Sequence, residues 1–178
     1  MLQEITISSE KIFNGKLLNL RIDKVLLPDK RESFREIVEH PGAVSVVPLN
    51  NEDIYLVKQY RKPVEEALLE IPAGTLEPGE DPLQCAHREL AEETGFKAGK
   101  IEKITTFYTS PGICTEIMHL YLASDLTDTE GQTDNDEFIK IEKHNYKDLN
   151  NLIIEGKIKD AKSIIGIVLA EKVLKNNK

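Results

Sequence analysis

The chain has 178 residues, of which 40% are hydrophobic and 30% charged, enough for one domain with its own core and a small appendage. Its net charge of −8 argues against an exposed nucleic-acid surface, which needs a basic stripe. We expect free thiols, because the two cysteines lack metal-ligand spacing. We also expect a cytoplasmic protein, because neither a secretion leader nor an apolar run long enough to cross a bilayer occurs.

The first forty residues predict a small antiparallel β-sheet. Alternating strand patterns cover residues 4–9, 18–25 and 33–38, and Asn14-Gly15 has the composition of a hairpin turn. A sheet of this size is marginal alone and needs a partner surface. His40-Pro41-Gly42 then breaks the chain, so we divide it into an N-terminal β-sheet unit, 1–40, and a main domain, 41–178.

The main domain alternates strand and helix patterns. Strands are predicted at residues 43–49, 54–59, 67–71, 101–108, 116–123 and 138–142, and helices at 82–94, 146–155 and 161–176. Residues 125–136 are acidic and rich in turn formers, so we expect a loop there. Strands interleaved with helices predict an α/β fold, an α/β/α sandwich around a mixed β-sheet.

The helix predicted at 82–94 has clear end signals. Asp81 is a good N-cap, and Gly95 supplies a left-handed C-cap. An apolar stripe is expected to face the sheet, made of Leu83, Cys85, Ala86 and Leu90.

The same helix carries three glutamates on one side, Glu89, Glu92 and Glu93. Neighbouring carboxylates repel one another unless a cation lies among them. Arg88 can pair with Glu92 at the i, i+4 spacing, which leaves the other two poorly compensated. Mg²⁺ meets that need, since it joins a few carboxylates to substrate phosphates. The alternative is a solvated acidic helix face stabilised by ion pairs.

The segment around this helix follows the pattern G-x5-E-x7-R-E-L-x-E-E-x-G-F from Gly74 to Phe96. It resembles the signature of the Nudix hydrolases, which cleave nucleoside diphosphates linked to another group. The resemblance implies a Nudix-type sandwich, with a small N-terminal antiparallel β-sheet beside it. The metal ligands it implies are Glu89, Glu93, Glu92 and the Ala73 carbonyl. It also implies that Glu80 braces the loop and that Arg88 orients the glutamates. Independently of the resemblance, Gly74 is expected to let the chain turn and to bring backbone close to a ligand.

Other segments resemble the ADP-ribose pyrophosphatase subfamily. Pro111 lies sixteen residues after Gly95, within Ser110-Pro111-Gly112. Residues 35–43, 57–63 and 155–158 agree with the same subfamily. The resemblance implies hydrolysis of ADP-ribose to AMP and ribose 5-phosphate. A turn proline between two strands is the alternative explanation of Pro111.

Substrate-binding roles follow from that resemblance. Arg35 and Arg61 are expected to bind the phosphates, and Pro111 and Gly112 to form the substrate loop. Glu116 is expected to contact the distal ribose or the metal, and Phe13 and Tyr60 to lie beside adenine. Guanidinium groups match phosphate geometry. The alternatives are ordinary ion pairs for the arginines and core positions for the aromatic residues.

The implied mechanism is attack of a metal-activated water on a phosphorus of the pyrophosphate. Two or three Mg²⁺ ions are expected, with Mn²⁺ as the alternative, and Glu92 and Glu93 count among the catalytic residues. The family implies a general base on the acidic loop beyond the helix: Glu137 first, then Asp136, with Asp134 also open.

The resemblance further implies a homodimer that exchanges its N-terminal units, so that Arg35 or Phe13 serves the partner's site. A monomer with a packed N-terminal sheet is the alternative.

Two other functions stay open. One is hydrolysis of another nucleotide, such as GDP-mannose, FAD or a dinucleotide coenzyme. The other is a non-catalytic nucleotide-sensing module, which the retained glutamates disfavour.

Overall fold

The computed structural model describes residues 2–129 and 138–176. The chain folds into two compact units. Unit 1 comprises Met1–Gly42 and Tyr108–Ile117, and unit 2 comprises Ala43–Phe107 and Met118–Lys178. The division expected between residues 40 and 41 stays a prediction, and the structure adds a distant segment, Tyr108–Ile117, to the N-terminal unit.

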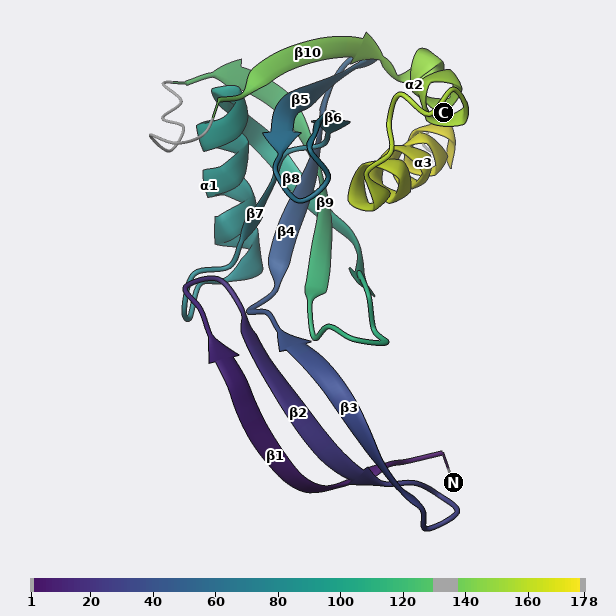
Figure 1. Ribbon diagram of the computed structural model, residues 1–178. Helices are drawn as coiled ribbons and strands as arrows, with labels where there is room; N and C mark the ends of the chain where they lie inside the picture. The colour runs from purple at the N-terminus through teal and green to yellow at the C-terminus, as the bar shows by residue number, and fades with distance from the viewer. Residues whose placement is uncertain (1, 130–137, 177–178) are drawn as a thin grey trace. The chain divides into compact units, whose positions relative to one another are not determined.

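Unit 1 contains a three-stranded antiparallel sheet in the order β1-β2-β3 (Figure 1). The strands are β1 (Ile5–Asn14), β2 (Asn19–Leu26) and β3 (Glu32–Glu39). The backbone N–H of Gly15 donates to Leu18 O at 2.9 Å and closes the predicted hairpin. All ten residues of β1 are exposed, several of them apolar. The sheet therefore presents an uncovered apolar surface.

Unit 2 is built on a mixed seven-stranded sheet in the order β10-β5-β4-β9-β8, with β6 beside β5 and β7 beside β4. Its strands are β4 (Ala43–Asn50), β5 (Asp53–Arg61), β6 (Glu66–Glu70), β7 (Ala73–Thr75), β8 (Phe96–Tyr108), β9 (Ile117–Asp128) and β10 (Lys140–Asn145). β4 and β9 run parallel, whereas β5 is antiparallel to each of its neighbours.

Helices cover both faces of this sheet: α1 (Pro82–Thr94) one face, α2 (Tyr146–Ile154) and α3 (Ala161–Asn176) the other (Figure 1). Alternate residues of β4 serve the two faces, as period-two side chains must. Val46 is buried in a cluster with Leu90 of α1. Val47 is buried in a second cluster with Ile167 of α3. The predicted α/β/α sandwich around a mixed β-sheet is confirmed.

Two sequence expectations need correction in this domain. The loop predicted at 125–136 is wrong for residues 125–128, which belong to β9. Pairing of β9 with β8 outweighs the acidic composition, and Leu126 packs against the core cluster beneath α1. Leu83, expected in the apolar stripe of α1, is 41% exposed. It lies in the first turn of the helix, whereas Leu90 is fully buried.

Both cysteines are free thiols; Cys85 is buried and Cys114 partly so. Among residues 2–129 and 138–176, no helix combines the length and apolar character needed to cross a membrane.

Candidate active site

Local end signals set the register of α1. The Asp81 carboxylate accepts hydrogen bonds from the backbone N–H groups of Leu83 at 2.9 Å and Gln84 at 3.3 Å. At the other end, Gly95 has φ 68° and ψ 21°, and its N–H donates to Ala91 O at 2.9 Å. These are the predicted N-cap and left-handed C-cap.

Two of the three glutamates of α1 are buried. Glu89 is 9% and Glu93 5% exposed, whereas the Glu92 side chain reaches solvent. Burying a carboxylate costs free energy unless it is hydrogen-bonded or paired with a cation. The N–H of Ala73, in β7, donates to Glu93 Oε2 at 2.9 Å. Glu93 is thereby held against the residue whose carbonyl the family resemblance assigns to a metal ion.

Gly74 makes room for the second buried carboxylate. A Cβ atom built on Gly74 would lie 1.8 Å from Glu89 Oε1 and 1.9 Å from its Cδ. Gly74 lies in β7 opposite Val44, and its φ is not in the left-handed region. The glycine is therefore required by the approach of a side chain, not by a turn of the backbone as the sequence suggested.

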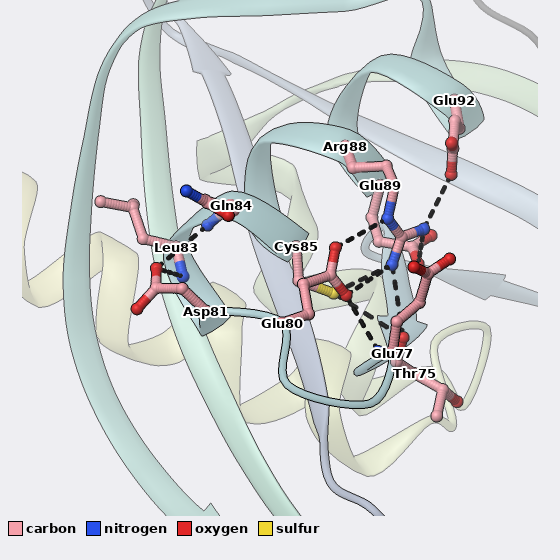
Figure 2. A network of polar contacts seen from close by, with 10 residues as sticks. All are labelled: Thr75, Glu77, Glu80, Asp81, Leu83, Gln84, Cys85, Arg88, Glu89 and Glu92. Atoms are coloured by element: carbon pink, nitrogen blue, oxygen red, sulfur yellow. Dashed lines mark hydrogen bonds and ion pairs between the residues drawn. The ribbon is translucent and has the colours of Figure 1, made fainter.

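Arg88 binds three carboxylates at once (Figure 2). Its Nε and Nη2 donate to Glu80 Oε1 at 2.9 Å and Oε2 at 3.0 Å. Its Nη1 donates to Glu89 Oε1 at 2.6 Å and Glu92 Oε2 at 2.9 Å. The predicted i, i+4 pair with Glu92 is present, but Arg88 compensates Glu89 as well. These bonds, led by that to Glu80, raise the pKa of Arg88.

Glu80 connects this network to the loop before α1. Besides pairing with Arg88, it accepts a hydrogen bond from the N–H of Glu77 at 3.0 Å (Figure 2). The hydrogen bond from Arg88 lowers the pKa of Glu80 to about 2. Burial raises the pKa of the neighbouring Cys85 thiol to about 12, so it stays protonated near neutral pH and offers no thiolate to a metal.

The oxygen atoms of these carboxylates suit a hard divalent cation. Buried carboxylate oxygens beside a backbone segment are the ligands that Mg²⁺ accepts, with substrate phosphates and water completing its shell. In the described part of the chain, no three His, Cys, Asp or Glu side chains are already grouped to hold a metal ion. Arg88 supplies positive charge to Glu89 and Glu92 instead. A metal ion at this place would draw on backbone or substrate oxygens in addition to the carboxylates of α1.

Arg61, one of the two predicted phosphate ligands, lies at the end of β5. Its Nε and Nη2 donate to Glu70 Oε1 at 2.8 Å and Oε2 at 2.9 Å. The hydrogen bond to Glu70 raises the pKa of Arg61, and the charge of Glu93 adds to that shift. Arg61 is therefore within electrostatic reach of Glu93 of α1. Tyr60, proposed beside adenine, is exposed.

Arg35, the other predicted phosphate ligand, lines a cavity of ≈ 340 Å³ within unit 1 together with Pro111 and Gly112. Its Nε and Nη2 donate to Glu4 Oε2 at 2.9 Å and Oε1 at 2.5 Å. The structure thus brings together three residues that sequence reasoning assigned to the substrate from segments far apart in the chain.

Glu116 and Phe13 complete the predicted set in unit 1. Glu116 accepts a hydrogen bond from Thr109 Oγ1 at 2.6 Å and lies 3.6 Å from His40 Nδ1. Phe13 is exposed on β1. The three predicted general bases, Glu137, Asp136 and Asp134, lie outside the described residues.

Sequence reasoning missed Glu70, the carboxylate that holds Arg61. The sequence held a signal for this role, because the charged Glu70 lies directly between two apolar residues, Leu69 and Ile71. A charge in such a strand is almost never fully buried unless it is paired.

Comparisons with known proteins match almost the whole chain. A family model described as the NUDIX domain matches residues 39–165. The chain is 46% identical to "ADP-ribose pyrophosphatase" of Bacillus subtilis (strain 168), over 93% of this chain and 91% of that protein. It is 45% identical to "Methanol dehydrogenase activator" of Bacillus methanolicus, over 94% of this chain and 92% of that protein. A solved structure titled "Crystal structure of ADP compounds hydrolase" has the same fold, with TM-score 0.90, 21% identity and coverage of 99% and 97% of the two chains.

Proposed function

This chain belongs to the Nudix family, and from that premise we propose that it hydrolyses the pyrophosphate of ADP-ribose to AMP and ribose 5-phosphate. The observation that carries the proposal is the pair of buried carboxylates, Glu89 and Glu93, packed against β7 where Gly74 leaves room for them. Extensive identity to a protein named ADP-ribose pyrophosphatase supports this substrate over other nucleoside diphosphates.

The metal site consists of Glu89, Glu93, Glu92 and the carbonyl of Ala73. Two or three Mg²⁺ ions, or Mn²⁺ in their place, would lower the pKa of a bound water and neutralise the pyrophosphate. Arg88 holds Glu89 and Glu92 in position through the bonds described above and does not touch substrate. Fixing ligand orientation in this way is how residues behind a metal site act.

The remaining steps need a base and a phosphate clamp. Water oxygen bonds to a phosphorus while the bond from that phosphorus to the bridging oxygen breaks. The proton of the water passes to Glu137 or, failing that, Asp136. Arg61 and Arg35 bind the phosphates, because a planar guanidinium group can donate two parallel hydrogen bonds to two oxygens of one phosphate.

The other substrate contacts are assigned by the same family resemblance. Pro111 and Gly112 form the loop beside the substrate, Glu116 contacts the distal ribose or the metal, and Phe13 and Tyr60 flank adenine. The cavity that Arg35 shares with Pro111 and Gly112 supports the first of these assignments.

The assembly we propose is a homodimer with exchanged N-terminal units, located in the cytoplasm. The exposed apolar residues of β1 and β3, including Ile5, Ile7 and Phe34, support the dimer, since a soluble monomer rarely exposes such a surface. The two free cysteines support a reducing compartment.

A substrate panel tests the proposal. ADP-ribose, GDP-mannose, FAD and a dinucleotide coenzyme are compared at equal concentration with Mg²⁺, and kcat/KM is measured for each. We expect ADP-ribose to be preferred. A preference of about tenfold or more for GDP-mannose, equal to roughly 1.4 kcal/mol of transition-state binding, would assign the site to another substrate.

A further inference from the structure

Glu70 is a buried carboxylate at the end of β6. It is 1% exposed, and it grips the Nε–Nη2 edge of Arg61 with two hydrogen bonds of 2.8 and 2.9 Å. A two-point contact of this kind fixes the plane of a guanidinium group as well as its distance. The Nη1 side of Arg61 lies outside the pair and faces away from Glu70.

A second cation reaches the same carboxylate from α3. Lys162 Nζ contacts Glu70 Oε2, and its side chain is only 13% exposed. Burial, the largest single influence, would raise the pKa of Glu70, but hydrogen bonds and charges from Arg61 and Lys162 lower it overall. Glu70 is thus ionised between two cations. Arg61 and Lys162 therefore hold this one carboxylate from two different elements, β5 and α3.

The N-terminus of α3 fixes Lys162 in turn. Asp160 Oδ2 lies 3.0 Å from Lys162 Nζ and accepts hydrogen bonds from the N–H and Oγ of Ser163 at 2.9 and 2.5 Å. Ser163 Oγ also accepts a hydrogen bond from the N–H of Ile71 at 2.8 Å. The helix therefore holds both the carboxylate of Glu70, through Lys162, and the backbone directly after it.

We propose that Glu70 and Lys162 are positioning residues that orient Arg61 for the diphosphate of the substrate. This inference rests on the proposed function, in which Arg61 binds phosphate. Glu70 sets the plane of the guanidinium. Lys162 holds the carboxylate of Glu70 in the place from which it grips Arg61. Neither residue touches the substrate.

The discriminating variant is Lys162→Met, which keeps the length of the side chain and removes its charge. Glu70 is then held by Arg61 alone, and the guanidinium of Arg61 is oriented less firmly for the phosphate. We expect KM for ADP-ribose to rise about tenfold with kcat within about twofold, because uniform binding is lost and the chemical step is not. Lys162→Arg should bring KM back to within about twofold of the wild type.

The matched control is Lys159→Met, which removes an exposed lysine paired with Glu66 on the surface. It makes the same charge change three residues earlier, and we expect no change in KM. Equal KM values for the wild type and Lys162→Met would overturn the inference. So would a loss confined to kcat and thermal stability, which is what a merely structural role produces.

Glu70→Gln separates orientation from charge. It removes a negative charge near the phosphates, so an effect of charge alone would lower KM. If Glu70 orients Arg61, KM rises instead. The rise in KM of the double variant Glu70→Gln/Lys162→Met should then be smaller than the two single effects combined, because the residues act as one network. Should Glu70→Gln fail to fold, the Lys162 variants still decide the matter.

Calorimetric binding of ADP-ribose in the presence of chelator gives a readout that does not need turnover. A wild-type protein that binds ADP-ribose but never hydrolyses it would defeat the proposed function. The Kd of the wild type compared with that of Lys162→Met would still test the role of Lys162.

Discussion

Glu80 shows how single residues arrange this site. It binds two nitrogens of Arg88 and one backbone N–H of the preceding loop. Charge-assisted hydrogen bonds of this kind are among the strongest in proteins. Arg88 is thereby fixed at one edge and turns its remaining nitrogen to Glu89 and Glu92. A residue that contacts no ligand in our account thus determines where two of the proposed metal ligands lie.

The lowered pKa of Glu80 gives a pH-dependent stability. Its pKa falls from 4.5 to about 2 on folding, so the ionised form stabilises the fold above pH 4.5, and this stabilisation is lost as the pH falls towards 2. We expect Glu80→Gln to lower the unfolding free energy by about 1–2 kcal/mol at pH 7, less than the full shift because water still reaches the group.

Urea denaturation at pH 7 and pH 3 measures this effect. The difference between wild type and variant should shrink by about half at the lower pH. Glu65→Gln, which changes an exposed carboxylate paired with Lys62, serves as the control. A difference that stays constant between the two pH values would contradict the assignment.

At the scale of elements, the site depends on the contact between β7 and α1. Glu93 accepts the N–H of Ala73, and Glu89 occupies the space beside Gly74. Two buried carboxylates of the helix thus lie against the strand. Such a junction is costly unless its charges are compensated, and that cost is what makes it a good site for a cation.

Gly74→Ala tests this junction. The added methyl would displace the flexible carboxylate of Glu89, whose atoms lie within 2.3 Å of the new Cβ. We expect kcat/KM to fall about a hundredfold, since small misplacements of catalytic groups are that costly. The unfolding free energy should stay within about 1 kcal/mol, because alanine suits a strand better than glycine.

Gly99→Ala, a substitution of a strand glycine in β8, is the control and should leave activity within about twofold. Full activity of Gly74→Ala would show that Glu89 does not need its present position.

Local signals explain which elements could be predicted from the sequence. The bounds of α1 follow from Asp81 and Gly95, whose cap preferences depend on few neighbours. Residues 125–128 could not be predicted, since pairing with β8 makes an acidic, turn-like segment into strand. Among site residues, the helix pattern indicated the glutamates, but the role of Glu70 depends on Arg61 and Lys162, which arrive from separate elements.

At the scale of the whole molecule, the exposed face of the N-terminal sheet is the feature that calls for a partner. We expect a homodimer, with a mass twice the 20.1 kDa of the chain, in size-exclusion chromatography with light scattering. Ile7→Asp places a charge on the exposed apolar surface of β1 and should shift the mass towards the monomer.

Ile154→Asp, on an exposed residue of α2, is the matched control and should leave the mass unchanged. A wild-type mass of about one chain would refute the dimer, and with it any contribution of Arg35 or Phe13 to a partner's site.

The central claim is that the carboxylates of α1 support metal-dependent cleavage of ADP-ribose. Its most direct test is hydrolysis of ADP-ribose with products resolved by chromatography, with and without chelator, for the wild type and for Glu93→Gln. A control variant, Glu102→Gln, alters an exposed carboxylate on β8 that pairs with Lys100. We expect AMP and ribose 5-phosphate in equal amounts with Mg²⁺, none with chelator, and a loss of roughly a thousandfold or more in Glu93→Gln while the protein stays folded. Intact ADP-ribose in the wild-type reaction, or undiminished turnover by Glu93→Gln, would contradict the account.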